Sequence, residues 1–210
     1  MTPTAIQPST YGRNASLARF SVAQYQKMIE TGILTAADKV ELLENYVVLK
    51  MSRNPPHDST IQRMMEVLFR IRPDGWSWRS QSAIMLPDSQ PEPDFALVRG
   101  SWEDYEIQHP RPADTALVIE VADSSIQLDQ REKARIYARA GIPAYWVVNL
   151  VDNRLEVYTL PSGPTTDPGF KVMQKLAPGD EVSIFVDGVS GTPMPVADLL
   201  PKKARRRRRS

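Results

Sequence analysis

The 210-residue sequence contains no cysteine, so disulfide bridges and thiolate metal ligands are excluded. It has no apolar run near the roughly 20 residues that cross a bilayer. Its first residues lack the apolar core of a secretory signal. We therefore expect a soluble, cytoplasmic protein without a membrane partner. The motifs GxGxxG, GxxxxGK[ST], GxSxG and HExxH are also absent, so a serine or cysteine hydrolase has little support.

The formal net charge of +1 conceals an uneven distribution of charge along the chain. Seven cations lie between residue 202 and the end, and the rest of the chain carries more acidic than basic residues. A basic tail can bind nucleic acid electrostatically, although a run of like charges is also typical of a disordered, solvated terminus. The candidate nucleic-acid-binding residues are Lys202, Lys203, Arg205, Arg206 and Arg207.

Hydrophobic periodicity and turn residues predict one α/β domain at residues 19–200, between a flexible leader at 1–18 and a disordered basic tail at 201–210. Helices are predicted at 22–29 after an N-cap at Ser21, in a short segment after Thr35 that includes residues 40–44, at 61–71 after a break at Pro55-Pro56, and at 129–140. Strands are predicted at 46–51, 76–86 (one or two), 95–98, 116–122, 144–149, 154–159, 171–176 and 181–185, followed by a last turn at 197–200.

The central unit is a strand, a helix and a second strand, which predicts a crossover that is right-handed if the two strands are parallel. The run at 116–122 is nearly all apolar, as in a strand buried on both faces. Alternation places Leu117, Ile119 and Val121 on one face and Val118, Glu120 and Ala122 on the other.

Two acids lie in these otherwise apolar strands, Asp94 at the start of one and Glu120 within the next. A carboxylate buried in a strand costs several kcal/mol unless it is paired or bound to a metal. Hard divalent ions such as Mg²⁺ prefer carboxylate oxygens. The pair therefore suggests a divalent-cation site. The alternative is structural, with Asp94 capping a turn and Glu120 paired with a basic residue.

The helix at 129–140 places Asp129, Lys133 and Tyr137 on one face, because four residues separate each from the next. If that face looks at the sheet, Lys133 can reach the two acids and stabilise a reacting phosphate or orient a water. The alternative is a surface Asp–Lys pair worth a few tenths of a kcal/mol. His57 could be a general base, a phosphate contact or a cap, and Glu41 could reach the same site or form a salt bridge.

Several of these motifs together resemble the Uma-type restriction endonuclease family, a branch of the PD-(D/E)XK nuclease superfamily common in cyanobacteria and actinobacteria. The resemblance covers about residues 20 to 200. The motifs are YQKMIETGILTAADKVELLENYVV from Tyr25, the helix-starting His57, Pro93-Asp94, IEVADSS from Ile119, then Asp129, Lys133, Tyr137 and GIPAYWVVN from Gly141.

The resemblance implies a restriction-endonuclease-like α/β fold (a mixed α+β sheet) with N-terminal helices and a C-terminal β extension. It also implies Mg²⁺- or Mn²⁺-dependent hydrolysis of DNA. Asp94 and Glu120 match the family's two metal-binding acids. Ala122 stands where the superfamily has a lysine. The resemblance assigns the role of that lysine to Lys133 on the following helix. Glu41 matches a family acid, although Asn45 replaces the usual glycine after it.

The alternative is a catalytically inactive module that binds nucleic acid or protein. A homodimer would suit cleavage of two strands, but the chain itself does not show one.

Overall fold

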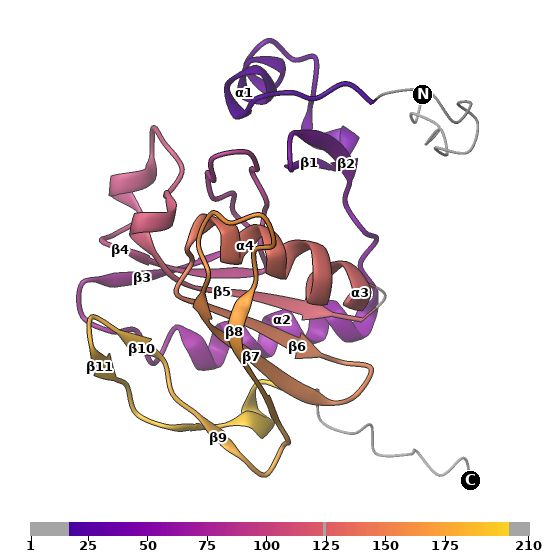
Figure 1. Ribbon diagram of the computed structural model, residues 1–210. Helices are drawn as coiled ribbons and strands as arrows, with labels where there is room; N and C mark the ends of the chain where they lie inside the picture. The colour runs from indigo at the N-terminus through magenta and orange to yellow at the C-terminus, as the bar shows by residue number, and fades with distance from the viewer. Residues whose placement is uncertain (1–16, 124, 202–210) are drawn as a thin grey trace, which may run out of the picture.

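The computed structural model describes residues 17–123 and 125–201, and its centre is a six-stranded sheet of order β3-β4-β5-β6-β7-β8 (Figure 1). The strands are β3 (Trp76–Ser80), β4 (Phe95–Arg99), β5 (Thr115–Ala122), β6 (Ala144–Asn149), β7 (Arg154–Pro161) and β8 (Phe170–Leu176). β5 and β6 are parallel, and every other pair of neighbours in this sheet is antiparallel. The predicted mixed sheet is therefore confirmed.

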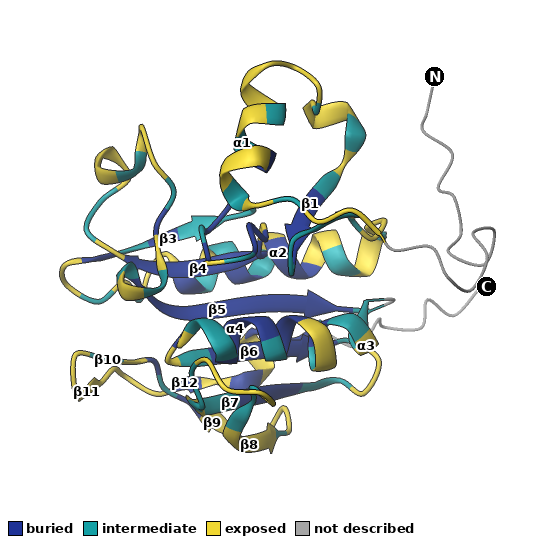
Figure 2. Ribbon diagram, turned by 45° about the horizontal axis from the view of Figure 1, so that its top comes forward, coloured by how far each residue is buried: buried dark blue, intermediate teal, exposed yellow. Residues whose placement is uncertain are grey.

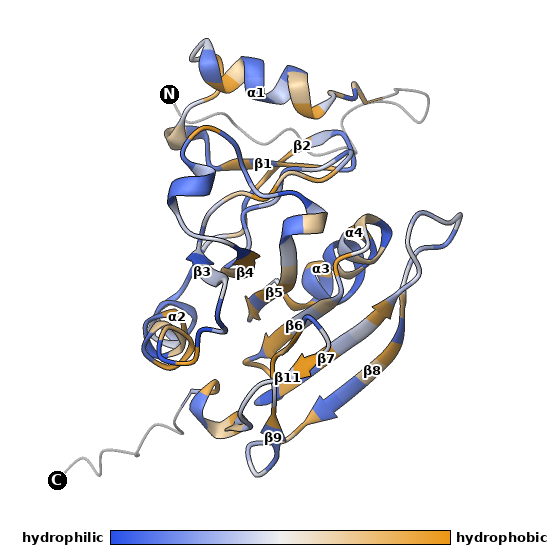
Figure 3. Cartoon of the chain, turned by 90° about the vertical axis from the view of Figure 1, so that its left-hand side faces the viewer, coloured by the Kyte–Doolittle hydropathy of each residue, from blue (hydrophilic) through white to orange (hydrophobic). Residues whose placement is uncertain are grey.

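Helices cover both faces of the sheet, and each face has its own hydrophobic core. Figure 3 shows α2 (Pro55–Leu68) and α4 (Ala134–Ala140) on opposite sides of the strands. Residues Leu117, Ile119 and Val121 pack with α2, whereas Val118 and Ala122 pack with α4. The predicted alternation along β5 is confirmed, and Figure 2 shows this strand buried along its length.

The crossover between β5 and β6 begins with α3 (Ile126–Leu128), continues as a π-helical turn at Asp129–Lys133, and ends with α4 at Gly141. Gly141 adopts a left-handed φ of 77°, a conformation that glycine reaches without a Cβ clash, so the predicted C-cap is confirmed. The sequence predicts a helix from residue 129, but it does not predict the π-helical geometry of the first five residues.

The N-terminal part contains α1 (Val22–Glu30), capped by Ser21 as predicted, and a hairpin of β1 (Val40–Leu43) and β2 (Tyr46–Leu49). The short 3₁₀ helix Ala36–Asp38 follows Thr35, but the helical prediction for residues 40–44 is wrong. Glu44 and Asn45 have φ of 49° and 68°, the pair of left-handed residues that a two-residue hairpin turn requires. Glu41 therefore lies on a strand.

The two prolines at 55 and 56 belong to the first turn of α2 and do not break the chain before it. Asn54 is the N-cap, and a first-turn proline is tolerated because that N–H would have no partner within the helix.

The segment after β8 returns to the α2 face of the sheet. It contains β9 (Glu181–Val182), β10 (Phe185–Val186), β11 (Val189–Ser190), β12 (Met194–Pro195) and the 3₁₀ turn Val196–Asp198. β9 pairs with β12 and β10 with β11, so the strand predicted at 181–185 is divided in two. The remaining short 3₁₀ turns are Glu103–Tyr105 and Pro112–Asp114. No helix in the described ranges is long and apolar enough to cross a membrane.

Candidate metal and phosphate site

The two strand acids lie side by side because of the register of β4 and β5. Phe95 pairs with Ile119 in this antiparallel ladder, so the residue before Phe95 lies next to the residue after Ile119. These residues are Asp94 and Glu120. The Asp94 carboxylate also accepts a hydrogen bond from the backbone N–H of Val121, with 2.8 Å between Oδ2 and N, which fixes the side chain against the end of β5.

Lys133 reaches the sheet from the π-helical turn. Its Nζ donates to Glu120 Oε1 over 2.9 Å, and the Tyr137 hydroxyl donates to the same oxygen, also over 2.9 Å. Lys133 Nζ lies 3.8 Å from Asp129 Oδ1. The helix face that carries these three residues therefore looks at the sheet, and the alternative of a surface Asp–Lys pair is excluded because Lys133 and Asp129 are buried.

Glu41 enters the site from the N-terminal hairpin. Its Oε1 lies 3.7 Å from Lys133 Nζ, and its Oε2 accepts the backbone N–H of Glu92 over 3.2 Å. A bridge between Leu42 and Gln90 ties the hairpin to the chain that leads into β4. The hairpin thus places an acid that sequence reasoning assigned to a helix next to the same ammonium.

His57 comes from the first turn of α2, and its Nε2 lies 3.2 Å from Asp94 Oδ2. Asn54 supports this arrangement twice: its Oδ1 accepts the backbone N–H of His57 over 3.1 Å, and its Nδ2 donates to Asp123 Oδ2 over 2.5 Å. Asn54 was missed by sequence reasoning, although an asparagine before two prolines and a helical pattern is an N-cap signal.

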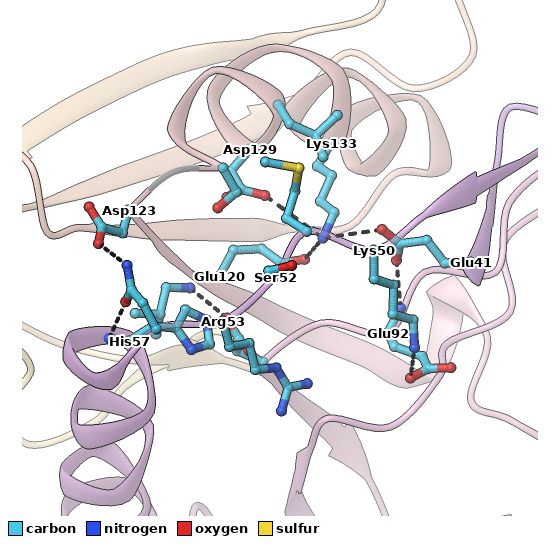
Figure 4. A pocket seen from close by; sticks show the side chains of 16 residues that line it. Glu41, Lys50, Ser52, Arg53, His57, Glu92, Glu120, Asp123, Asp129 and Lys133 are labelled. Carbon is cyan, nitrogen blue, oxygen red and sulfur yellow. Dashed lines mark hydrogen bonds and ion pairs between the residues drawn. The ribbon is translucent and has the colours of Figure 1, made fainter. Parts of the chain in front are cut away.

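Figure 4 shows Glu41, His57, Glu120, Asp129 and Lys133 converging on one pocket. The volume of this pocket is about 80 Å³. This volume leaves room for a cation and a few waters. The site residues that line it are Glu41, His57, Asp94, Glu120, Asp129 and Lys133. Tyr137 does not line the pocket but donates to Glu120. The predicted nucleic-acid-binding residues lie outside the described residues; they are Lys202, Lys203, Arg205, Arg206 and Arg207.

The charges in the buried part of the pocket are unbalanced, because four buried carboxylates share it with one buried ammonium, that of Lys133. Glu41, Asp94, Glu120 and Asp129 are each exposed by only 2–7%. Burial raises the pKa of Glu120 against the opposing effect of Lys133, and burial likewise raises the pKa of Asp129. The carboxylates together raise the pKa of Lys133, although its burial acts in the opposite direction.

His57 shows a similar balance. Burial, the largest single effect, disfavours its charged form, but the hydrogen bond and the charge of Asp94 together with the hydrogen bond to Asp58 outweigh burial and raise the pKa of the imidazole. A positive charge on His57 is therefore favoured beside Asp94, as expected in a pocket with excess negative charge.

The donor set fits a hard cation that keeps most of its ligands as water or phosphate. In residues 17–123 and 125–201, no three carboxylate or imidazole groups converge to hold a metal ion by themselves. Mg²⁺ needs only one or two protein carboxylates. Within those ranges no hydrogen bond engages Asp94 Oδ1 or Glu120 Oε2, so each acid has an oxygen free for an ion.

Comparison with solved structures defines the class of fold. A crystal structure from Anabaena variabilis ATCC 29413, described as a putative nuclease belonging to DUF820, aligns with a TM-score of 0.61 and 13% sequence identity, covering 86% of this chain and 97% of that chain. At this identity the similarity shows the fold alone, a nuclease-like mixed α+β architecture. Comparison with curated proteins gives no match.

The family follows from the sequence itself. Residues 22–190 match the model of the Uma2 family, described as "Putative restriction endonuclease". The match spans most of the chain, so the protein belongs to the Uma2 family. The predicted family and the predicted fold class are both confirmed.

Proposed function

We propose that this protein is a Mg²⁺- or Mn²⁺-dependent endonuclease that hydrolyses phosphodiester bonds of DNA. The observation that carries the proposal is the gathering of four buried carboxylates and one buried ammonium in a single pocket, with three of the carboxylates within 4 Å of the ammonium. A divalent cation would neutralise this excess of negative charge. Membership of a restriction endonuclease family makes DNA the substrate class to test first.

Each residue at the centre of the pocket has a role that its contacts support. Asp94 and Glu120 would hold the ion through the oxygens that are free of hydrogen bonds. When bound, Mg²⁺ would polarise a phosphoryl oxygen and supply an acidic water. The Lys133 ammonium has three N–H donors. One is used by Glu120, so the others can donate to a phosphate oxygen or orient the attacking water.

The surrounding residues would position this centre. His57 and the Val121 N–H hold one oxygen of Asp94, which leaves the other directed to the ion. Tyr137 fixes Glu120 by sharing the oxygen that Lys133 contacts. Glu41 and Asp129 keep Lys133 charged, because both carboxylates raise its pKa.

The substrate would meet the pocket at its mouth, where a backbone phosphate could reach the ion and Lys133. The segment between β2 and α2 crosses this mouth and carries Lys50 and Arg53 (Figure 4). Lys50 is paired with Glu92, whereas Arg53 is exposed. Arg53 is the cation best placed to contact a backbone phosphate beside the scissile bond.

Cleavage of supercoiled plasmid DNA tests the proposal. We expect wild-type protein to produce open-circular and linear DNA with Mg²⁺ or Mn²⁺ and none with EDTA. Asp94→Asn and Glu120→Gln should abolish cleavage with an unchanged circular dichroism spectrum. Asp74→Asn and Glu66→Gln remove exposed acids outside the pocket and should cleave like the wild type.

Two results would replace the proposal by another function. DNA binding without cleavage of any DNA form by either ion would indicate a catalytically inactive binding module. No DNA binding even at low salt would indicate a protein-interaction module on the same fold.

A further inference from the structure

Another buried acid, Glu156, lies on the same face of the sheet as Glu120. Glu120 of β5 pairs with Val147 of β6, and Val147 pairs with Glu156 of β7. The two acids thus flank one valine, roughly 10 Å apart at the usual strand spacing. Both lie beneath the crossover helix that carries Lys133. Glu156 does not line the pocket, so the proposed chemistry does not use it.

Glu156 is completely buried, yet its carboxylate is fully supplied with hydrogen-bond donors. Four side chains donate to it: Gln130 Nε2 over 2.9 and 2.8 Å to its two oxygens, Asn149 Nδ2 over 3.0 Å, Arg154 Nε over 2.8 Å and the Tyr158 hydroxyl over 2.9 Å. A carboxylate this deeply buried persists only with such partners. Burial alone would raise its pKa, but these hydrogen bonds outweigh burial and hold the pKa below its ordinary value.

Three of these four donors come from the sheet or the turn beside it, and the fourth comes from the helix. Gln130 belongs to the π-helical turn, three residues before Lys133. The same turn is held a second time by Tyr145 of β6, whose hydroxyl donates to the Asp129 backbone carbonyl over 3.0 Å. A π-helical turn is less favourable than an α-helical one and occurs where side-chain contacts or function require it. The contacts of Gln130 with Glu156 and of Asp129 with Tyr145 are side-chain contacts of this kind.

We propose that Glu156 is a positioning residue that acts through Gln130. Anchoring Gln130 to the sheet fixes the rotation of the π-helical turn about its axis. That rotation brings Lys133 Nζ into hydrogen-bonding distance of Glu120 and places Asp129 next to Lys133. Two side chains of the crossover helix therefore donate hydrogen bonds to acids of the sheet: Gln130 donates to Glu156, and Lys133 donates to Glu120. The catalytic importance of this anchor rests on the proposed nuclease function, whereas the anchor itself does not.

The ¹H–¹⁵N NMR signal of the Lys133 ammonium tests the proposal, and it is read without DNA or metal. A buried, hydrogen-bonded ammonium exchanges its protons slowly enough to be seen, and its loss in Lys133→Met assigns the signal. Gln130→Met keeps the size of the side chain but removes both hydrogen bonds to Glu156. We expect the signal to broaden beyond detection in Gln130→Met, and to persist in Arg131→Met, a matched control at the exposed neighbouring position.

Exchanging the two partners separates positioning from a general loss of stability. Gln130→Glu alone places two carboxylates together and should abolish the signal. Combining it with Glu156→Gln restores an amide–carboxylate pair and should restore the signal, even if thermal unfolding shows that the double variant is less stable than the wild type. If plasmid cleavage occurs, it should follow the signal through the same variants.

Three results would overturn the proposal: a Lys133 signal unchanged in Gln130→Met, no signal in the wild type, or no recovery in a folded double variant. A wild-type protein that shows the signal but cleaves no DNA would refute the nuclease function and leave the anchor standing.

Discussion

Lys133 and Glu120 form the ion pair on which the pocket is centred, with 2.9 Å between Nζ and Oε1 and both side chains buried. The lysine enters from the crossover helix and the acid from the preceding strand, so the pair also joins the helix to the sheet. Among the described residues only one oxygen of Glu120 is engaged, because Tyr137 donates to the same Oε1. The pair therefore leaves Glu120 able to take a second ligand.

Removing the ammonium of Lys133 should destabilise the fold, because Glu41, Glu120 and Asp129 would lose the one positive charge that all three contact. We expect Lys133→Met to lower the free energy of unfolding by about 3 kcal/mol at pH 7, measured by urea denaturation without divalent ions. The double variant Lys133→Met/Glu120→Gln removes both charges and should recover part of this loss. Losses that simply add in the double variant would show that the two residues do not interact.

His57 should affect metal affinity more than stability, because it orients Asp94 from the edge of the pocket. We expect His57→Ala to weaken Mn²⁺ binding by about 10- to 100-fold, as is usual for a residue that holds a metal ligand. His57→Gln, which keeps a donor, should lose less. Electron paramagnetic resonance of free Mn²⁺ during a titration measures this affinity. Equal affinity in the wild type, His57→Ala and His57→Gln would show that His57 does not support metal binding.

Glu156 should make stability depend on pH in the acid range. Its folded-state pKa is below the ordinary value of 4.5, so the unfolded chain binds more protons near that pH and the stabilisation by Glu156 is present above 4.5. It is lost as the pH falls through the folded-state pKa. We therefore expect the difference in unfolding free energy between wild type and Glu156→Gln to shrink as the pH is lowered from 6 to about 3. A difference that stays constant would mean that the Glu156 charge is not stabilised in the fold.

The basic tail should contribute to DNA affinity without contributing to the pocket. Deleting residues 202–210 removes seven cations. We expect the dependence of log K on log salt concentration to become shallower by up to about 0.9 for each DNA phosphate that the tail neutralises in the full chain. Cleavage at saturating protein should persist. An unchanged salt dependence in a fluorescence anisotropy titration would show that the tail neutralises no phosphates.

The central sheet was predictable because its two middle strands are apolar on both faces. The runs at 116–122 and 144–149 are nearly all apolar, which is typical of strands in the middle of a sheet with both faces covered. The helix between them ends at a glycine. The segment at 40–44 was not predictable in the same way. Five residues are too few to separate a helical from an extended period, and the turn at Glu44-Asn45 lacks the glycine that usually marks a hairpin.

The centre of the site was predictable from single residues, but its supports were not. Asp94 and Glu120 are conspicuous as acids in apolar strands, and Lys133 follows from helical spacing. The contacts Asn54–Asp123 and Gln130–Glu156 join residues 69 and 26 positions apart. They depend on strand register and on a π-helical turn, which local patterns do not determine.

The most direct test of the account is the position of a divalent ion in crystals grown or soaked with Mn²⁺. We predict an anomalous scattering peak within bonding distance of the Asp94 and Glu120 carboxylates, beside the Lys133 ammonium, that is lost in Asp94→Asn. A structure at the same Mn²⁺ concentration in which these two carboxylates bind no ion, or in which the ion lies elsewhere, would contradict it.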